Sequence, residues 1–402
     1  MKLTSGELLS KETVATIAAR SAVLLINFLI VVFTTNNWGP GGRGEIALVI
    51  TNVAIIAILS NITCGTTIAF HAQKEKAELL VLISLAGVLI FSLAGSVIFS
   101  LTTGFKYFKD LFIISLLISL NNAISNYWLG RNNIKLYNIL MMLNPGLILL
   151  FLFVFWNIFR IGTIRACFYS YYAGLGVLLI IGLLTLRPLG PFRLPAVGFR
   201  NVLNILKYGT GNELNNFIQF LNYRLSYFFI AKILGLATLG IFSVAVSCAE
   251  AVWIASKSMS ALNYSGIISS DDRMSAVSST IGYAKQSFWV SILIMLIAIM
   301  IPRSLFEYVF GTGFGVVKIY LIWLIPGIIA MAVSNLYGHY FSGIGKLNIV
   351  RNRALLGLSV TVALLFLLTG KYLLKGVCIA LDASYMLSSG YLYFKFRREV
   401  TA

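Results

Sequence analysis

Long apolar runs, separated by short polar segments that contain Gly, Pro, Lys or Arg, recur along the whole chain. A helix needs about 20 apolar residues to cross the hydrocarbon core of a membrane, and the alternation of a membrane β-barrel, with its roughly ten-residue segments, is absent. The pattern predicts an all-α membrane protein with 12 transmembrane helices, at residues 12–33, 45–70, 79–101, 109–129, 136–158, 165–186, 204–233, 237–263, 282–301, 316–342, 347–369 and 373–394.

The segment between the sixth and seventh spans, RPLGPFRLPAVGFRN at residues 187–201, differs from the other connections. It contains Pro188, Pro191 and Pro195, which break helices and stiffen a link. We therefore expect an N-terminal six-helix bundle over residues 1–190 and a C-terminal six-helix bundle over residues 191–402.

The two halves share a glycine pattern. The first hairpin contains WGPGGRGEIALV, and spans seven and eight are joined by LGLATLGIFSVA. When Gly39 is aligned with Gly235, Gly44 falls on Gly240. Each pattern follows a long apolar helix and opens another, as expected for a duplicated six-helix unit.

A second match supports the same duplication. YWLGRNNIKLYNI, from Tyr127, is similar to YFSGIGKLNIV, from Tyr340, and each joins a span to the next through a Gly and a basic turn. Because six is even, both copies enter the membrane in the same direction. This predicts two bundles related by a pseudo-two-fold axis along the membrane normal, with a substrate path at their interface.

Composition agrees with the pattern, since 59% of the 402 residues are hydrophobic and 11% are charged, whereas a soluble domain is nearer half apolar and a quarter charged. The formal net charge is +18. In so apolar a chain, basic loops set the topology and touch anionic membrane lipids, so nucleic acid is not an expected partner. The four cysteines are scattered singly within predicted spans, without disulfide or metal spacing. The N-terminal segment contains Glu7 and Glu12 and is not expected to be a cleavable signal peptide.

Orientation follows from the positions of Lys and Arg. If the N-terminus lies in the cytoplasm, more of these residues fall in cytoplasmic segments than in outer ones. The positive-inside rule then predicts that both termini are cytoplasmic.

Arg224 lies near the middle of the seventh span, in NFIQFLNYRLSYFFIAKILGL, with no acid three or four residues away. A central Arg costs roughly 2.5–3.5 kcal/mol on insertion scales, so it should face a cavity, a partner or water. A guanidinium can hold an anion through two parallel hydrogen bonds. The alternatives are a structural pair with Glu250 or Asp382, or a side chain that reaches the membrane interface.

The same span has two polar sides. One is a stripe at helical spacing, and Arg224 lies roughly 140° away from its centre. One side can line a cavity while the other packs through amide hydrogen bonds, and the sequence leaves open which does which. The stripe consists of Asn212, Asn215, Asn216, Gln219, Asn222, Tyr223 and Ser226.

Other polar residues complete the candidate site. Arg20, early in the first span, is either part of a substrate path or a cytoplasmic anchor. Lys257 follows Glu250 by two helical turns, so the two form either a gate or a structural ion pair. Arg43, at the first glycine turn, is expected at the outer rim. We therefore assign a substrate path to Arg224, Arg20, Lys257, Arg43, Asn216, Gln219 and Tyr223.

Three acids within spans are candidates for ion coupling: Asp382, Glu250 and Glu213. A carboxylate is the usual carrier of H+ or Na+ in a transporter; the alternative for each acid is a structural role, which acids within spans more often have. Pro145 and Pro326 interrupt apolar spans and are each followed by Gly, so both are candidate hinges or static kinks.

The sequence shows no nucleophile–base arrangement, phosphate-binding loop or zinc spacing. We therefore expect a transporter rather than an enzyme, with no catalytic residues, no metal site and no cofactor beyond a coupling ion.

The twelve spans in two halves, the GPGGRGEIAL turn after the first span and the LGLATLGIFSVA turn after the seventh resemble the Wzx-type O-antigen flippases. These belong to the multidrug, oligosaccharidyl-lipid and polysaccharide exporter (MOP) superfamily. The resemblance covers essentially the whole chain and marks the superfamily better than the substrate. It implies two bundles in a V around a cationic cavity, and alternating access driven by an ion gradient.

The resemblance also implies a substrate and a location. The expected substrate is an undecaprenyl-pyrophosphate-linked oligosaccharide, an O-antigen or similar repeat unit, moved from the cytoplasmic to the periplasmic leaflet of the bacterial cytoplasmic (inner) membrane. A polysaccharide polymerase and a chain-length regulator are the implied protein partners. One alternative is a multidrug or cation antiporter, which should have an acidic cavity. Another is a membrane polysaccharide polymerase, which typically has a large outer loop.

Overall fold

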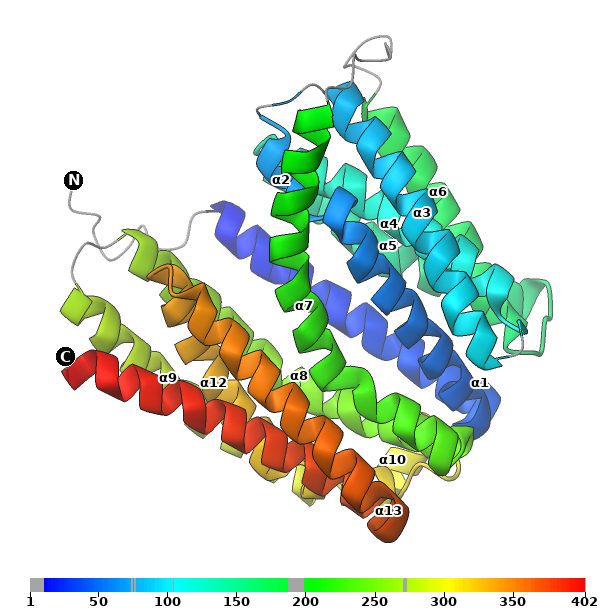
Figure 1. Ribbon diagram of the computed structural model, residues 1–402. Helices are drawn as coiled ribbons and strands as arrows, with labels where there is room; N and C mark the ends of the chain where they lie inside the picture. Colours follow the sequence, from blue (N-terminus) through cyan, green and yellow to red (C-terminus); the bar gives the residue numbers. More distant parts are fainter. Residues whose placement is uncertain are drawn as a thin grey trace. The chain divides into compact units, whose positions relative to one another are not determined.

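The computed structural model describes residues 11–73, 75, 77–103, 105–186, 199–269 and 273–401, and their regular elements are helical (Figure 1). The Pro-rich link of Pro188, Pro191 and Pro195 lies outside the described residues. The helices are α1 (Lys11–Cys64), α2 (Thr66–His71), α3 (Ala77–Thr103), α4 (Phe108–Gly130), α5 (Ile134–Phe153) with a π-helical turn η1 (Val154–Ile158), α6 (Arg165–Leu186), α7 (Phe199–Ile233), α8 (Leu236–Ser269), α9 (Arg273–Met300), α10 (Arg303–Phe310), α11 (Val317–Trp323), α12 (Ile325–Gly343) and α13 (Leu347–Thr401).

The described helices confirm an all-α membrane protein. Eight are long and apolar enough to cross a membrane, or nine if α11 and α12, which meet at a bend of 55°, form one broken span. Two of them, α1 and α13, are each two helices joined at a residue with non-helical backbone, Gly39 and Leu373. The 35-residue α7 is also long enough, but its polar residues keep it out of that group. Each of the predicted spans thus has a helix in the structure.

The chain packs into two compact units. The first comprises Met1–Ile30 and Val49–Phe217, and the second comprises Val31–Leu48 and Ile218–Ala402. Both α1 and α7 therefore contribute residues to both units. The predicted boundary between an N-terminal and a C-terminal six-helix bundle at residue 190 stays a prediction. The boundary between the two compact units falls within α7, after Phe217.

In the first unit, an apolar core joins α1, α2, α3, α4 and α7. Its buried members are Cys64, Ile68, Ala72, Leu79, Leu80, Ile83, Val88, Tyr127 and Ile205. A polar clamp joins α4 to α6: Nη1 of Arg165 donates to both carboxylate oxygens of Asp110, at 3.0 and 2.8 Å, and the Tyr172 hydroxyl donates to Oδ1 at 2.6 Å. Asp110 is buried, and the sequence pattern did not single it out.

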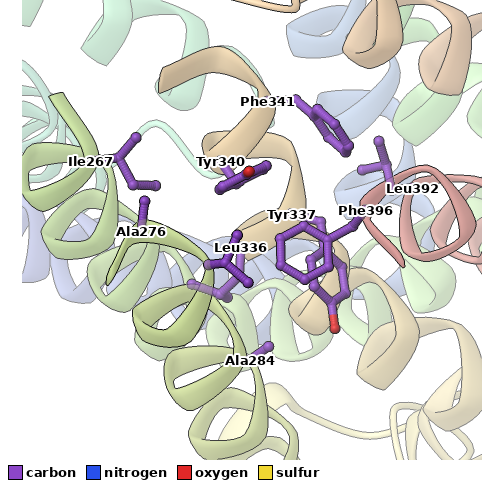
Figure 2. Packing of buried hydrophobic residues seen from close by; sticks show 10 residues of the cluster. Ile267, Ala276, Ala284, Leu336, Tyr337, Tyr340, Phe341, Leu392 and Phe396 are labelled. Carbon is purple, nitrogen blue, oxygen red and sulfur yellow. The ribbon is translucent and has the colours of Figure 1, made fainter. Parts of the chain in front are cut away.

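In the second unit, aromatic and aliphatic side chains fill the space between α8, α9, α12 and α13 (Figure 2). The buried residues are Ile267, Ala276, Val277, Ala284, Leu336, Tyr337, Tyr340, Phe341, Leu392 and Phe396. Tyr340 and Phe396 pack edge to face with ring centroids 4.9 Å apart, an arrangement that aromatic pairs favour.

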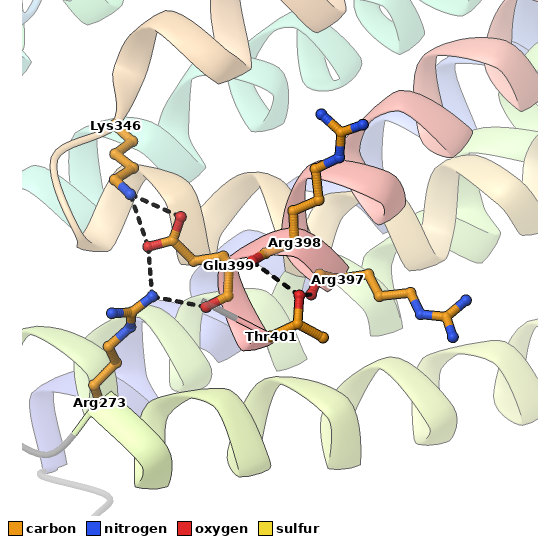
Figure 3. A network of polar contacts seen from close by, with 6 residues as sticks. All are labelled: Arg273, Lys346, Arg397, Arg398, Glu399 and Thr401. Atoms are coloured by element: carbon orange, nitrogen blue, oxygen red, sulfur yellow. Dashed lines mark hydrogen bonds and ion pairs between the residues drawn. The ribbon is translucent and has the colours of Figure 1, made fainter.

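A charged network lies at the end of α13 (Figure 3). Nζ of Lys346 donates to both carboxylate oxygens of Glu399 at 2.7 Å, and Nη2 of Arg273 donates to Oε1 of Glu399 at 2.9 Å and to its carbonyl at 2.7 Å. These contacts tie the end of α13 to the start of α9 and to the turn after α12.

The first pair of aligned glycine turns adopts matching backbone conformations. Gly39 has φ of 59° and Gly235 has φ of 89°, a region that glycine enters at little cost and other residues do not. In both places the positive φ ends one helix immediately before the next begins.

The same two turns meet each other within the second unit. A Cβ on Gly44 would collide with the carbonyl of Leu236, and a Cβ on Gly240 would collide with the carbonyl of Pro40. Because Pro40 aligns with Leu236 and Gly44 with Gly240, the contact is reciprocal and has local two-fold symmetry. This is the relation that the duplicated glycine pattern predicts.

The second pair of aligned turns also matches. Asn132 and Gly345 occupy equivalent positions and have φ of 61° and 76°. Three backbone hydrogen bonds of the first turn recur at the aligned positions of the second. They run from Arg131, Asn132 and Asn133 to Tyr127, Leu129 and Trp128, and from Ile344, Gly345 and Lys346 to Tyr340, Ser342 and Phe341.

Candidate functional site

The helix α7 carries most of the predicted site, and the structure assigns one of its sides to packing. Asn222 is buried, and its side-chain oxygen accepts hydrogen bonds from Thr361 at 2.8 Å and from Ser384 at 3.2 Å. Ser226, one turn further on, is also buried. This part of the polar stripe therefore holds α7 against α13.

Arg224 forms an ion pair with Glu250 of α8. The distance from Nη2 of Arg224 to Oε1 of Glu250 is 2.9 Å, and to Oε2 it is 3.1 Å. The guanidinium also lies over the ring of Tyr227, 5.1 Å from its centroid. Of the two partners that the sequence offered, the structure selects Glu250. The side chains of Arg224 and Glu250 remain 21% and 31% exposed, so the pair is only partly buried.

Three aromatic rings on α7, α8 and α13 pack against one another. Tyr223, Trp253 and Tyr385 come from three helices, and their centroids lie 5.6 to 6.1 Å apart. Gln219 donates from Nε2 to the Tyr223 hydroxyl at 2.8 Å. Trp253 and Tyr385 are buried, whereas Tyr223 is half-buried, so Tyr223 is the member of this group that remains partly accessible to a ligand.

A second cation, Lys257 of α8, lies beside the aromatic group. Lys257 is exposed, and its Nζ lies 6.0 Å from the centroid of Trp253. Glu250, which shares its helical face, contacts Arg224 instead. The structure therefore places Gln219, Tyr223, Arg224, Glu250 and Lys257 together in the second unit.

Arg43 belongs to the same unit. Its Nε donates to the hydroxyl of Ser243 at 3.1 Å, and its Nη1 lies 3.4 Å from the hydroxyl of Thr34. These contacts fix Arg43 beside the reciprocal glycine turns.

A buried cation that sequence reasoning missed also lies in the second unit. Arg353 of α13 is 5% exposed, and its Nη2 contacts Sδ of Met331 on α12. It stands near the start of α13 in the basic run RNR at residues 351–353, which is typical of a connection at the membrane surface. The available signal was the apolar run ALLGL that follows it.

The other acids have separate surroundings. Asp382 is half-buried and accepts the backbone N–H of Gly327 at 3.0 Å. That N–H belongs to the first turn of α12, where helical donors lack intrahelical partners. A Cβ on Gly327 would collide with this carboxylate, so the contact requires glycine. Asp382 therefore stabilises the start of α12 and does not pair with Arg224.

Glu213 is buried in the first unit. Its Oε1 accepts from the Thr66 hydroxyl at 3.2 Å and its Oε2 accepts from the Asn216 amide at 3.0 Å. Within the described part of the chain, no Lys or Arg pairs with Glu213. Glu213 and Asn216 are thus neighbours, in a different unit from Arg224.

The remaining candidates do not join either group. Arg20 is exposed on α1. Pro145 lies inside α5, which continues through it as one helix. Pro326 lies in the first turn of α12, at the 55° bend that follows α11. A hinge motion at either residue stays a prediction.

The arrangement offers charged and aromatic groups that can recognise a ligand. Among the described residues, no group of three or more His, Cys, Asp or Glu side chains could hold a metal ion. In the second unit, the cations Arg224 and Lys257 are at least partly exposed, and half-buried Tyr223 adjoins Arg224 in α7. Such a set can bind an anion that also has apolar or sugar surfaces.

No known protein family matches the chain by sequence, and no curated protein matches it. Solved structures do match its fold. One is the inward-facing conformation of a multidrug resistance MATE family transporter of the MOP superfamily, with a TM-score of 0.75, 14% identity, and coverage of 98% of this chain and 95% of that chain. Another is the outward-facing conformation of such a transporter, with a TM-score of 0.68, 16% identity, and coverage of 100% and 99%.

A third solved structure with this fold comes from Pyrococcus furiosus, with a TM-score of 0.66, 16% identity, and coverage of 100% of this chain and 99% of that chain. It is described as a MOP superfamily transporter in which a reverse polarity of the binding pocket suggests a different function. The chain therefore has the fold of MATE transporters of the MOP superfamily over essentially its whole length.

Proposed function

We propose that this protein moves an anionic lipid-linked oligosaccharide, of the undecaprenyl-pyrophosphate type, from the cytoplasmic to the periplasmic leaflet of a bacterial cytoplasmic membrane by alternating access. The observation that carries the proposal is the basic and aromatic cluster of the second unit. Within it, one carboxylate, Glu250, pairs with Arg224, while Lys257 and Arg353 have no described acidic partner. A pyrophosphate is an anion that exposed Lys257 and partly exposed Arg224 can bind.

The fold supports a transporter, since the solved structures that share it are transporters. The sign of the charge at the binding site distinguishes an anionic substrate from a cationic one. A drug or cation antiporter needs an acidic site, whereas the cations outnumber the acids in the cluster around Arg224. The reversed pocket polarity described for the Pyrococcus furiosus protein supports the idea that this fold carries pockets of either sign.

The deciding experiment locates lipid-linked repeat units in cells that lack the chain, before and after the gene is restored. We expect the units to accumulate on the cytoplasmic leaflet and to reach the periplasmic leaflet on restoration. Normal translocation in the deletion strain, together with new sensitivity to cationic drugs, would contradict the proposal and favour the antiporter.

Transport of this kind needs an energy source, and we propose Glu213 as the site of H+ or Na+ coupling. Glu250 is neutralised by Arg224 and Asp382 holds the start of α12, whereas buried Glu213 has only neutral donors among its described partners. A buried carboxylate is costly unless it is neutralised, so binding of a cation is favourable there. We expect Glu213→Gln to abolish the dependence of translocation on the gradient, measured with an uncoupler or with Na+ replaced by K+. Retained dependence on either gradient would reject this role.

A further inference from the structure

A groove in the second unit is separate from the cluster around Arg224. It lies between α9, α12 and the end of α13, and has a volume of ≈ 750 Å³, within the range of about 300–1,000 Å³ that holds small ligands. Its walls are mainly apolar and aromatic, with Trp289, Tyr337 and Tyr393 among them. The two charged side chains that line it are Lys285 and Arg397.

The groove opens on a surface that meets lipid. Trp289 of α9 and Phe394 of α13 are each 66% exposed, and Leu293, one turn after Trp289, is exposed as well. In a membrane protein, exposed apolar side chains of this size contact acyl chains rather than water. Membrane lipid therefore has direct access to the groove.

The floor of the groove belongs to the packed core. Ala284, Tyr337 and Phe396 line it and are at most 8% exposed, and Figure 2 shows them within the same cluster. The rings of Tyr337 and Phe396 lie 4.8 Å apart. A ligand would therefore find the groove already formed.

The charges around the groove are unbalanced. Glu399 forms ion pairs with Arg273 and Lys346. Figure 3 shows that Arg397, on the same helical turn, extends away from that network. In the part of the chain that the structure describes, neither Lys285 nor Arg397 has an acidic partner. Two positive charges therefore lie beside an apolar groove without a matching anion.

We propose that this groove holds a membrane phospholipid with an anionic headgroup. Its phosphate accepts hydrogen bonds from Lys285 and Arg397, and an acyl chain lies along the aromatic wall. Basic pockets between transmembrane helices bind anionic headgroups in this way, and a long Lys side chain can reach a headgroup from within a helix. A choline headgroup would bring a further positive charge to the two cations, so phosphatidylcholine is disfavoured.

The test uses the full chain, purified in detergent micelles, with added phosphatidylglycerol or with phosphatidylcholine of the same acyl chains. We expect phosphatidylglycerol to raise Tm by at least about 3 °C more than phosphatidylcholine does. The double variant Lys285→Gln/Arg397→Gln should lose most of this difference and should retain one fewer phosphatidylglycerol molecule in native mass spectra. The matched control Lys318→Gln/Arg398→Gln removes the same charge from the same unit and should keep both effects.

Three outcomes would overturn the proposal. The first is an equal effect of the two lipids on the Tm of the wild-type protein, and the second is a full phosphatidylglycerol effect in the double variant. The third is displacement of the bound phosphatidylglycerol by undecaprenyl pyrophosphate, which would assign the groove to the substrate. If the double variant does not fold, the exposed single variant Lys285→Gln and the wild-type mass spectrum decide. Because the groove lies apart from Arg224, a failure here leaves the proposed flippase activity standing.

Discussion

At the scale of single residues, Arg224 shows how a cation is accommodated in an apolar helix. Its guanidinium forms an ion pair with the carboxylate of Glu250 and lies over the ring of Tyr227. The pair has two possible roles. Glu250 can neutralise Arg224 so that the helices pack, or it can give way to a ligand anion that binds Arg224 in its place. The partial exposure of both side chains permits the exchange.

We expect Arg224→Ala to lower translocation of lipid-linked units by at least about tenfold, since hydrogen bonds to charged groups contribute roughly 1.5–3 kcal/mol. Arg224→Lys should retain part of the activity if charge alone matters, and little of it if the planar guanidinium is needed. Surface glycan, normalised to the amount of protein in the membrane, measures both. Lys232→Ala, on the same helix, is the matched control.

A double variant separates recognition from stability. If the pair only stabilises the fold, Arg224→Ala/Glu250→Ala should recover activity, because it removes the uncompensated charge on Glu250. If Arg224 binds the substrate, the double variant should stay as inactive as Arg224→Ala. Full activity in Arg224→Ala at a matched protein level would exclude the substrate role.

At the scale of helices and turns, glycines decide where the elements can meet. The contact between Gly44 and Gly240 places one backbone directly against the other. A methyl group at either position must push the two turns apart. Since the contact is reciprocal, both substitutions should have similar consequences.

We expect Gly44→Ala and Gly240→Ala each to destabilise the protein by about 1–3 kcal/mol, the usual cost of overpacking, seen as a lower Tm in detergent. Gly41→Ala is the matched control, because a Cβ at Gly41 has no atom within 4 Å and its φ is not in the left-handed region. A Tm for Gly44→Ala equal to that of Gly41→Ala would show that the turns are not in contact.

At the scale of the whole molecule, the distribution of basic residues predicts the orientation in the membrane. Lys371 is exposed next to the break within α13, and Arg398 is exposed near its end. These two positions should therefore lie on opposite sides of the membrane, with Arg398 in the cytoplasm. The native cysteines give little background, since Cys64, Cys167 and Cys378 are buried and Cys248 is half-buried.

A membrane-impermeant maleimide tests this orientation. We expect it to label Lys371→Cys in intact cells and to label Arg398→Cys only after the membrane is opened. The reverse pattern would place Lys371 in the cytoplasm and Arg398 outside, and would also place the groove with Lys285 and Arg397 in the outer leaflet.

The sequence by itself determined the helical class, the spans and the two pairs of glycine turns. These features depend on local composition: a run of apolar residues long enough to cross a membrane, and positions where backbone strain or close approach requires Gly. Pro lacks a backbone N–H and therefore marks a possible break or kink in a helix. The sequence alone does not separate Pro326, which lies at the bend before α12, from Pro145, which lies inside the continuous α5.

Only the tertiary structure decided which charged residues are paired or buried. Arg224 could pair with Glu250 or Asp382, and the packing of α7 against α8 selected Glu250. Asp382 instead holds the start of α12, and Arg353 is buried although its sequence position looks peripheral. Ion pairs and burial depend on side chains that helices distant in the sequence bring together. Helical periodicity predicts on which face of its helix a residue lies, but not which other helix packs against that face.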